Sequence, residues 1–175
     1  MSLPRLLTVL ALLLSMIPPS TALAAPGMVY LVRHGEKLPD EKDPALTAQG
    51  RQRAQNIAAM LGKTGIAHVF STATRRTLQT AQPLAQASGL PVQEYDPRAP
   101  KALVEKVKGL NGPVLVVGHS NTLSELVRLF GGQPGLEIAD NEYDRVYQLI
   151  YQPGPGANTV MTVLFTSLPP TGPAP

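Results

Sequence analysis

The sequence contains no cysteine. This absence excludes disulfide bonds, thiolate catalysis, zinc sites built on cysteine and a lipidated N-terminal cysteine. The stability of the protein must therefore come from its hydrophobic core. A chain of 175 residues, 43% of them hydrophobic, can bury enough surface for such a core. The length indicates a single domain.

An excess of charge of one sign is also missing. Lysine and arginine number 15 and acidic residues 12, which gives a formal net charge of +3. This bias is too small and too scattered to predict binding to nucleic acid or to a membrane surface. A local cluster of positive side chains is nevertheless enough to hold a small anion.

The N-terminal residues include an apolar run that is too short to span a membrane. The run extends from Leu6 to Ile17, about 12 residues, whereas a membrane span needs about 20. Arg5 precedes the run, and the small-x-small segment Ala22-Leu23-Ala24 follows it. We therefore predict a signal peptide over residues 1–24 and a periplasmic or secreted protein, with an uncleaved membrane anchor as the alternative.

Hydrophobic periodicity in the rest of the chain predicts alternating strands and helices. Strands are expected at 28–32, 66–70, 91–95, 114–117, 145–152 and 159–166, and helices at 47–62, 74–88, 101–110 and after Ser120. Such alternation is typical of an α/β three-layer sandwich with a mainly parallel sheet. Residues 25–167 are predicted to form the domain, and the proline-rich residues 168–175 a disordered tail.

Three sets of polar residues follow predicted strands. Arg33-His34 comes after the first strand, Arg75-Arg76 after the second and His119 after the fourth. Ligands of parallel sheets bind beyond the carboxyl ends of the strands, so these residues are expected to meet at one edge. Guanidinium groups bind phosphate oxygens and stabilise a phosphoryl group in transfer. The remaining histidine, His68, is interpreted as structural.

Four stretches of the sequence match a known pattern in the same order. Leu31-Val32-Arg33-His34-Gly35-Glu36 resembles the signature of the histidine phosphatase superfamily, which includes the cofactor-dependent phosphoglycerate mutases. The other stretches that resemble this family are Leu46-Thr47-Ala48-Gln49-Gly50, Phe70-Ser71 with Arg76-Thr77-Leu78-Gln79-Thr80-Ala81, and Val117-Gly118-His119-Ser120. The resemblance implies a phosphoglycerate mutase-like fold.

The resemblance also implies a role for individual residues. His34 would be the nucleophile and form a phosphohistidine that water then hydrolyses. Arg33, Arg76 and His119 would bind the phosphate oxygens, with His119 acting as a protonated donor. Arg76 is preferred to Arg75 because it lies three residues before Gln79, as in the family. The family pattern implies no metal and no organic cofactor.

The general acid is the position at which this chain departs from larger family members, many of which carry a glutamate in an inserted segment. We expect Asp96 to take this role, because it should emerge at the active-site edge after the third strand. Glu36 and Glu94 are rival candidates. A further alternative is that no acid is needed, since good leaving groups such as phosphohistidine depart unaided.

The resulting functional hypothesis is a phosphatase that acts on phosphomonoesters or phosphoramidates of small molecules. One alternative is a non-catalytic module of the cell envelope that binds phosphate or a phosphorylated ligand. A mutase is disfavoured because the chain leaves little room for the segments that grip a bisphosphate. A serine hydrolase is disfavoured because Thr122 replaces the last glycine of the G-x-S-x-G elbow around Ser120. No nucleic-acid partner and no stable membrane insertion after cleavage are expected, and the oligomeric state is left open.

Overall fold

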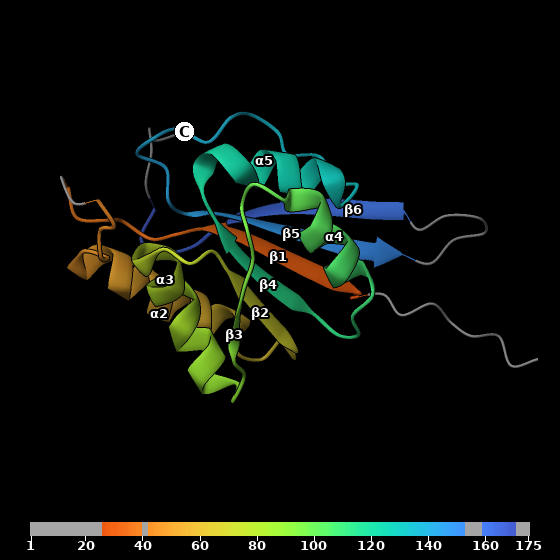
Figure 1. Cartoon of the computed structure of the whole chain (residues 1–175), viewed down its shortest axis with the longest axis horizontal. Coiled ribbons are helices and arrows are strands. Elements are labelled where there is room, and N and C mark those ends of the chain that lie inside the picture. The colour runs from red at the N-terminus through yellow and green to blue at the C-terminus, as the bar shows by residue number, and fades with distance from the viewer. Residues whose placement is uncertain (1–25, 40–41, 153–158, 171–175) are drawn as a thin grey trace, which may run out of the picture.

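The computed structural model describes residues 26–39, 42–152 and 159–170, and the predicted signal peptide lies outside these residues. All the predicted strands and helices are present, with ends displaced by at most two residues. In chain order they are β1 (Met28–Arg33), α2 (Ala48–Leu61), β2 (His68–Ser71), α3 (Arg75–Ala87), β3 (Val92–Glu94), α4 (Pro100–Lys108), β4 (Val114–Gly118), α5 (Ser120–Leu129), β5 (Arg145–Gln152) and β6 (Thr159–Thr166) (Figure 1). Among the described helices, none has both the length and the apolar character needed to cross a membrane.

The strands form one sheet in the order β3-β2-β4-β1-β5-β6. The pairs β1·β4, β2·β3 and β2·β4 are parallel, whereas β1·β5 and β5·β6 are antiparallel. The sheet is therefore mixed. The predicted parallel arrangement holds for β3, β2, β4 and β1, whereas β5 and β6 are antiparallel to their neighbours. The reason is that only six residues, 153–158, connect β5 to β6, and a short connection between successive strands gives an antiparallel pair.

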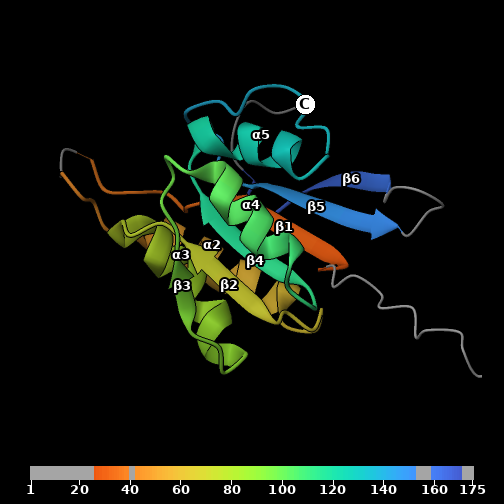
Figure 2. The same ribbon diagram turned by 45° about the vertical axis from the view of Figure 1, so that its right-hand side comes forward.

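Helices cover both faces of the sheet and make three layers. Alternate residues of β1 point to opposite faces, so Val29 and Leu31 pack in the core with α4 and α5, whereas Tyr30 and Val32 pack with α2 and α3. Figure 2 shows α4 and α5 on one side of the sheet and α2 and α3 behind it. Burial on both faces accounts for the continuous apolar sequences of β1 and β4.

The parallel strands bring their carboxyl ends to one edge of the sheet. Arg33 at the end of β1 pairs with Gly118 at the end of β4. The backbone N–H of His34 donates to the Gly118 carbonyl at 3.0 Å, so His34 and His119 leave adjacent strands at the same level. His68 begins β2 at the opposite edge, where its Nε2 lies 3.1 Å from the Asn111 carbonyl oxygen.

The segment from Leu46 to Gly50 holds the loop that follows β1. The Thr47 side chain caps α2 by accepting from the Gly50 N–H at 3.0 Å, and the Thr47 N–H donates to the Glu36 carbonyl at 2.9 Å. A Cβ atom on Gly35 would lie 2.7 Å from the Gly50 carbonyl oxygen. The two glycines are therefore required by the close approach of two backbones.

Arg53 of α2 connects this loop to the end of β6. Its side chain is fully buried, and it forms a two-bond pair with Glu36, Nη2 to Oε1 at 2.6 Å and Nε to Oε2 at 3.0 Å. Its Nη1 donates to both the carbonyl and the hydroxyl of Ser167 at 3.1 Å. The hydrogen bonds of this guanidinium therefore tie the loop at Glu36 and the end of the domain at Ser167 to α2.

We expect Arg53→Met to lower the free energy of unfolding by about 3 kcal/mol or more, because Glu36 would keep a nearly buried charge with no partner. Urea denaturation followed by circular dichroism measures the change. The double variant Arg53→Met/Glu36→Gln removes the unpaired charge and should recover part of the loss. A cost below about 1 kcal/mol for the single variant would contradict this account of the pair.

Candidate active site

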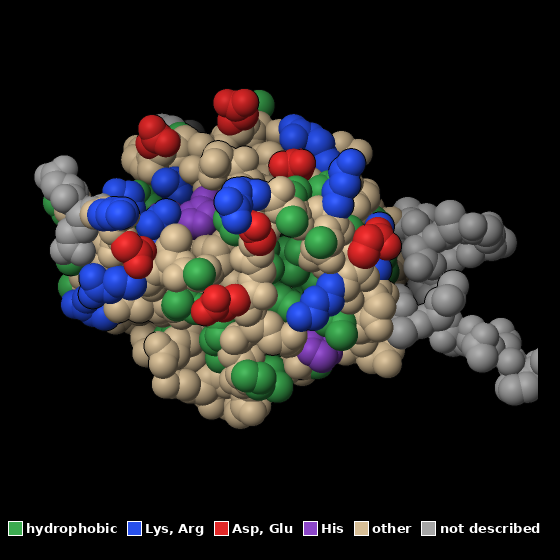
Figure 3. Space-filling view, viewed as in Figure 1, with side chains coloured by type: hydrophobic (Ala, Val, Ile, Leu, Met, Phe, Trp, Pro, Cys, Tyr) green, Lys and Arg blue, Asp and Glu red, His purple; other side chains and the backbone are tan. Residues whose placement is uncertain are grey.

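A hollow of about 410 Å³ opens at the carboxyl ends of β1 and β4. It is lined by His34, Lys37, Arg76, Pro97, Arg98, His119, Ser120, Asn121 and Thr122. Figure 3 shows histidine at the surface in this region, with lysine and arginine side chains gathered around it. No carboxylate is among the described residues that line the hollow, so its charge is strongly positive and suits an anion.

His34 is held in one orientation by the backbone. Its Nδ1–H donates to the Gly35 carbonyl at 2.8 Å, which leaves the lone pair on Nε2. Burial is the main cause that lowers the pKa of His34 to about 3, and the positive charges of Arg76 and Arg33 act in the same direction, whereas the Gly35 hydrogen bond raises it. The imidazole is therefore neutral near pH 7, which is the state that a nucleophile needs.

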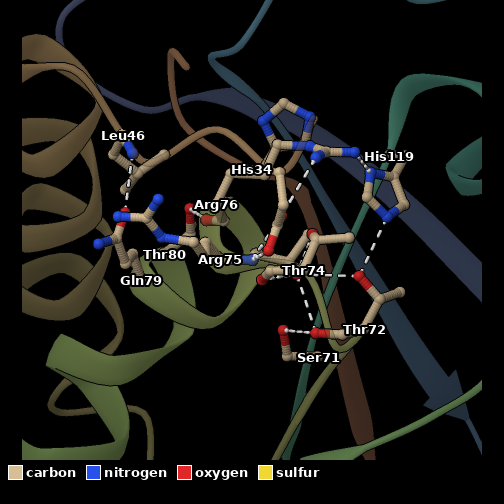
Figure 4. A network of polar contacts seen from close by, with 12 residues as sticks. His34, Leu46, Ser71, Thr72, Thr74, Arg75, Arg76, Gln79, Thr80 and His119 are labelled. Carbon is tan, nitrogen blue, oxygen red and sulfur yellow. Dashed lines mark hydrogen bonds and ion pairs between the residues drawn. The ribbon is translucent and has the colours of Figure 1, made fainter. Parts of the chain in front are cut away.

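His119 lies beside His34, with the ring centroids 5.5 Å apart. Its Nδ1 faces Arg76 Nη2 at 3.4 Å, and its Nε2 lies 3.0 Å from Thr72 Oγ1 (Figure 4). Burial and then the charges of Arg76 and Arg33 lower the pKa of His119 to about 4. The family resemblance implies that His119 acts as a protonated donor. In the ligand-free protein His119 is instead neutral near pH 7, and it requires a bound anion to become charged.

Arg76 enters the hollow from the first turn of α3. Its Nη1 lies 3.9 Å from the Asp43 carboxylate, and its Nη2 faces His119. Its Nε is buried and has no hydrogen-bond partner among the described residues. A buried N–H without a partner is costly, and an anion in the hollow is a natural acceptor for it.

Arg33 occupies a different position from the one expected of a phosphate ligand. Its Nη1 donates to the carbonyls of Ala139, Asp140 and Glu142 at 2.9, 3.0 and 2.7 Å, and its guanidinium lies 4.1 Å from the ring centre of Tyr143. Arg33 does not line the hollow. Its Nε is nevertheless buried without a partner among the described residues, so direct phosphate binding by Arg33 stays a prediction.

The expectation that Asp96 is the general acid is not supported. Asp96 lines a neighbouring hollow rather than the one that contains His34, and its carboxylate accepts from Arg98 Nε at 3.0 Å and Nη2 at 2.9 Å. The hydrogen bonds from Arg98 lower the pKa of Asp96, which keeps it ionised. The physical reason is local, because Pro97 and Arg98 line the hollow of His34, whereas the Asp96 carboxylate is bound to Arg98 and lines the neighbouring hollow.

The two rival acids do not line the hollow either. Glu36 is bound to the buried Arg53, and Glu94 lines the same neighbouring hollow as Asp96.

Sequence reasoning missed three other residues near the histidines, namely Thr72, Arg98 and Tyr143. Thr72 follows β2 directly, so its place at the carboxyl end of a strand was the available signal.

In the described ranges, no group of three or more His, Asp or Glu side chains is arranged to hold a metal ion. The expectation that no metal and no organic cofactor is needed stays a prediction.

Residues 29–97 match the family model of the histidine phosphatase superfamily (branch 1). The resemblance to this superfamily that the sequence motifs indicate is confirmed over these residues. The probable phosphoglycerate mutase GpmB of Escherichia coli O139:H28 is 36% identical over 104 residues, which cover 55% of this chain and 44% of that protein. The chain therefore aligns with less than half the length of this curated relative.

Solved structures of histidine phosphatases share the fold. The protein histidine phosphatase SixA in complex with tungstate aligns with a TM-score of 0.62 at 20% identity, over 79% of this chain and 96% of SixA. A mycobacterial glucosyl-3-phosphoglycerate phosphatase aligns with a TM-score of 0.62 at 17% identity, over 80% of this chain and 98% of that protein. The predicted phosphoglycerate mutase-like α/β sandwich is thus confirmed.

Acid should destabilise this protein through its two buried imidazoles. An unfolded histidine takes up a proton below its ordinary pKa of 6.5, whereas His34 and His119 stay neutral down to about 3 and about 4. The unfolded state therefore binds more protons in this window, and the free energy of unfolding falls as the pH drops from 6.5 to 4, by up to about 1.4 kcal/mol per pH unit for each histidine.

Urea denaturation at several pH values measures this slope. We expect His34→Asn and His119→Asn each to flatten it, and His68→Asn to leave it as in the wild type. An unchanged slope in both active-site variants would show that these histidines protonate equally in the folded and unfolded states.

Proposed function

We propose that this chain is a phosphatase that hydrolyses phosphomonoesters or phosphoramidates through a phosphohistidine on His34. The observation that carries the proposal is the neutral, fixed imidazole of His34 in a hollow with Arg76 and His119. The partnerless buried Nε atoms of Arg33 and Arg76 support an anionic ligand. Together these groups supply a nucleophile and donors for the oxygens of one phosphoryl group.

The first step is attack by Nε2 of His34 on the phosphorus atom. The new N–P bond replaces the bond to the leaving group, which departs with its electron pair. The positive charge that develops on the ring is stabilised by the hydrogen bond from Nδ1–H to the Gly35 carbonyl. Arg76, His119 and the N-terminal end of α5 at Ser120 surround the phosphoryl oxygens, where their positive charge is most useful.

The second step regenerates the enzyme. Water attacks the phosphorus atom, the N–P bond breaks, and His34 returns to its neutral state while inorganic phosphate leaves. The same arginine and imidazole donors stabilise the charge in both steps. One proton of the attacking water passes to solvent or to the released leaving group, so the overall reaction consumes only substrate and water.

The hollow provides donors for the phosphoryl oxygens but no evident proton donor for the leaving group. The described residues that line it include no carboxylic acid to protonate a departing alkoxide. We therefore favour substrates whose leaving group is already good, such as phosphohistidine and other phosphoramidates. Simple alkyl phosphates should react more slowly by up to about 10²–10⁴.

The relatives are consistent with a small phosphorylated substrate. One solved structure with this fold is named a protein histidine phosphatase, and another a glucosyl-3-phosphoglycerate phosphatase. Lys37 and Arg98 also line the hollow and add positive charge to it. A substrate with a further anionic group would suit this rim.

The alternative is a module that binds a phosphorylated ligand without turning it over. The absence of a carboxylic acid among the described lining residues favours this alternative, because the same donors would bind phosphate without catalysis. The two functions differ in one observable, the covalent phosphoenzyme. Tight phosphate binding without a detectable phosphoenzyme would support the binding module.

We expect His34→Ala to reduce hydrolysis of p-nitrophenyl phosphate and of a phosphohistidine substrate by about 10⁴-fold or more, because it removes the nucleophile. Quenching with sodium dodecyl sulfate at alkaline pH after reaction with ³²P-labelled substrate should trap a phosphoenzyme that is stable to alkali and labile to acid in the wild type, and none in the variant. His68→Ala is the matched control and should retain both signals. Turnover that persists in His34→Ala would refute the assignment of the nucleophile.

Export is the second part of the proposal, and it rests on the N-terminal sequence. Cleavage after Ala24 would leave 151 residues (175 − 24). We expect N-terminal sequencing of the protein from the envelope fraction of a bacterial host to begin at Ala25. Recovery of a full-length chain from the cytoplasm would contradict the predicted periplasmic or secreted location.

A further inference from the structure

A chain of buried hydroxyl groups leads away from His119. Thr72 Oγ1 lies 3.0 Å from His119 Nε2 and 2.9 Å from Thr77 Oγ1. Thr77 Oγ1 in turn donates toward the carbonyls of Thr72 and Thr74, both at 2.9 Å, and lies 2.8 Å from Thr74 Oγ1. Thr72 and Thr77 are almost completely buried, at 1% and 0% exposure. Figure 4 shows these contacts running from His119 to the start of α3.

The proton arrangement at His119 follows from its contact with Arg76. A guanidinium can only donate, so His119 Nδ1, which lies 3.4 Å from Arg76 Nη2, is the acceptor. Nε2 of the neutral imidazole then carries the proton, and Thr72 Oγ1 accepts it at 3.0 Å. The hydroxyl proton of Thr72 has an acceptor in Thr77 Oγ1, whose own proton has acceptors in two carbonyls.

The buried hydroxyl groups fit the tautomer of His119 that Arg76 favours. Thr72 Oγ1 can accept from Nε2–H because the hydroxyl proton of Thr72 has its own acceptor in Thr77 Oγ1. The lone pair of the imidazole then lies on Nδ1, which faces Arg76 Nη2. His34 has the opposite arrangement, because its Nδ1 carries the proton that Gly35 accepts. The two neighbouring imidazoles are therefore expected as different tautomers.

We propose that Thr72 is a positioning residue for His119, which keeps the proton on Nε2 and so presents Nδ1 to Arg76 and to the bound phosphoryl group. This inference rests on the proposed function. When a phosphate dianion binds, Nδ1 takes up a proton and becomes a donor, while Nε2–H remains bound to Thr72. The Thr72 oxygen then stabilises the imidazolium, because hydrogen bonds to charged donors are the stronger ones.

The charged groups around His119 make this support necessary. Arg76 of α3 and Arg33 of β1 lower its pKa, His34 lies at ring contact, and Lys37 and Arg98 line the same hollow. Apart from the bound anion, the Thr72 hydroxyl is the contact of His119 that favours its protonated form. Its loss should therefore make His119 harder to protonate in the complex.

The test uses nitrogen-15 NMR of the ligand-free protein with labelled histidine, in which only His34, His68 and His119 give signals. We expect the wild type to show His119 as the Nε2–H tautomer and His34 as the Nδ1–H tautomer. Thr72→Val keeps the size and branching of the side chain but removes the hydroxyl, and should give a mixture of tautomers at His119. His119→Gln assigns the signal.

Two variants separate the hydroxyl from the fold of the loop. Thr72→Ser keeps the hydroxyl and should restore the wild-type tautomer. Thr74→Val removes a hydroxyl from the same network without touching His119 and should leave the tautomer unchanged. A wild-type His119 with its proton on Nδ1, or a Thr74→Val spectrum like that of Thr72→Val, would overturn the proposal.

Kinetics give a second readout. Thr72→Val should lower kcat by roughly fivefold to tenfold, the loss expected for one hydrogen bond, and move the alkaline limb of the pH profile to lower pH. Thr72→Ser should recover both. An unchanged pH profile in Thr72→Val would refute the positioning role. Wild-type protein without phosphatase activity would instead refute the proposed function, since the tautomers are measured without substrate.

Discussion

The pairing of β1 with β4 is the constraint on which the site depends. These two strands are adjacent, parallel and in register at their last residues, with Arg33 opposite Gly118. The hydrogen bond from the His34 N–H to the Gly118 carbonyl extends this register one step beyond the strand. Two imidazoles that are 85 positions apart in the chain (119 − 34) therefore stand side by side without any direct bond between them. A slip of one residue would turn one of them into the core.

The charges at this edge of the sheet are unbalanced, with an excess of positive groups. Both imidazoles are neutral because they are buried and because arginines lie close to them. The ligand-free site thus holds positive charge and lone pairs but no carboxylate among the described lining residues. Such an arrangement is unfavourable by itself and becomes favourable when a dianion enters, which links affinity for phosphate to the protonation of His119.

The part of the fold that can be predicted from sequence is the part governed by local pattern. Apolar runs located every strand, and the position of polar residues after those runs brought His34, Arg76 and His119 to one edge. The direction of a side chain is not encoded in such a pattern, which is why the sequence could not reveal that the Asp96 carboxylate is bound to Arg98 and lines a neighbouring hollow. The carbonyls that hold Arg33 come from a loop more than a hundred positions away, and no motif encodes Thr72 as the partner of His119.

The buried guanidinium of Arg53 has a consequence for how the edge that carries His34 is completed. It joins Glu36, two positions after His34, to Ser167, which is 131 positions further along the chain (167 − 36). Synthesis must therefore pass Ser167 before the loop beside His34 acquires its final support. A shortened chain that ends before Ser167 would lose this anchor although every proposed active-site side chain is still encoded. Competence of the site in this sense depends on residues that lie far beyond its last side chain in the sequence.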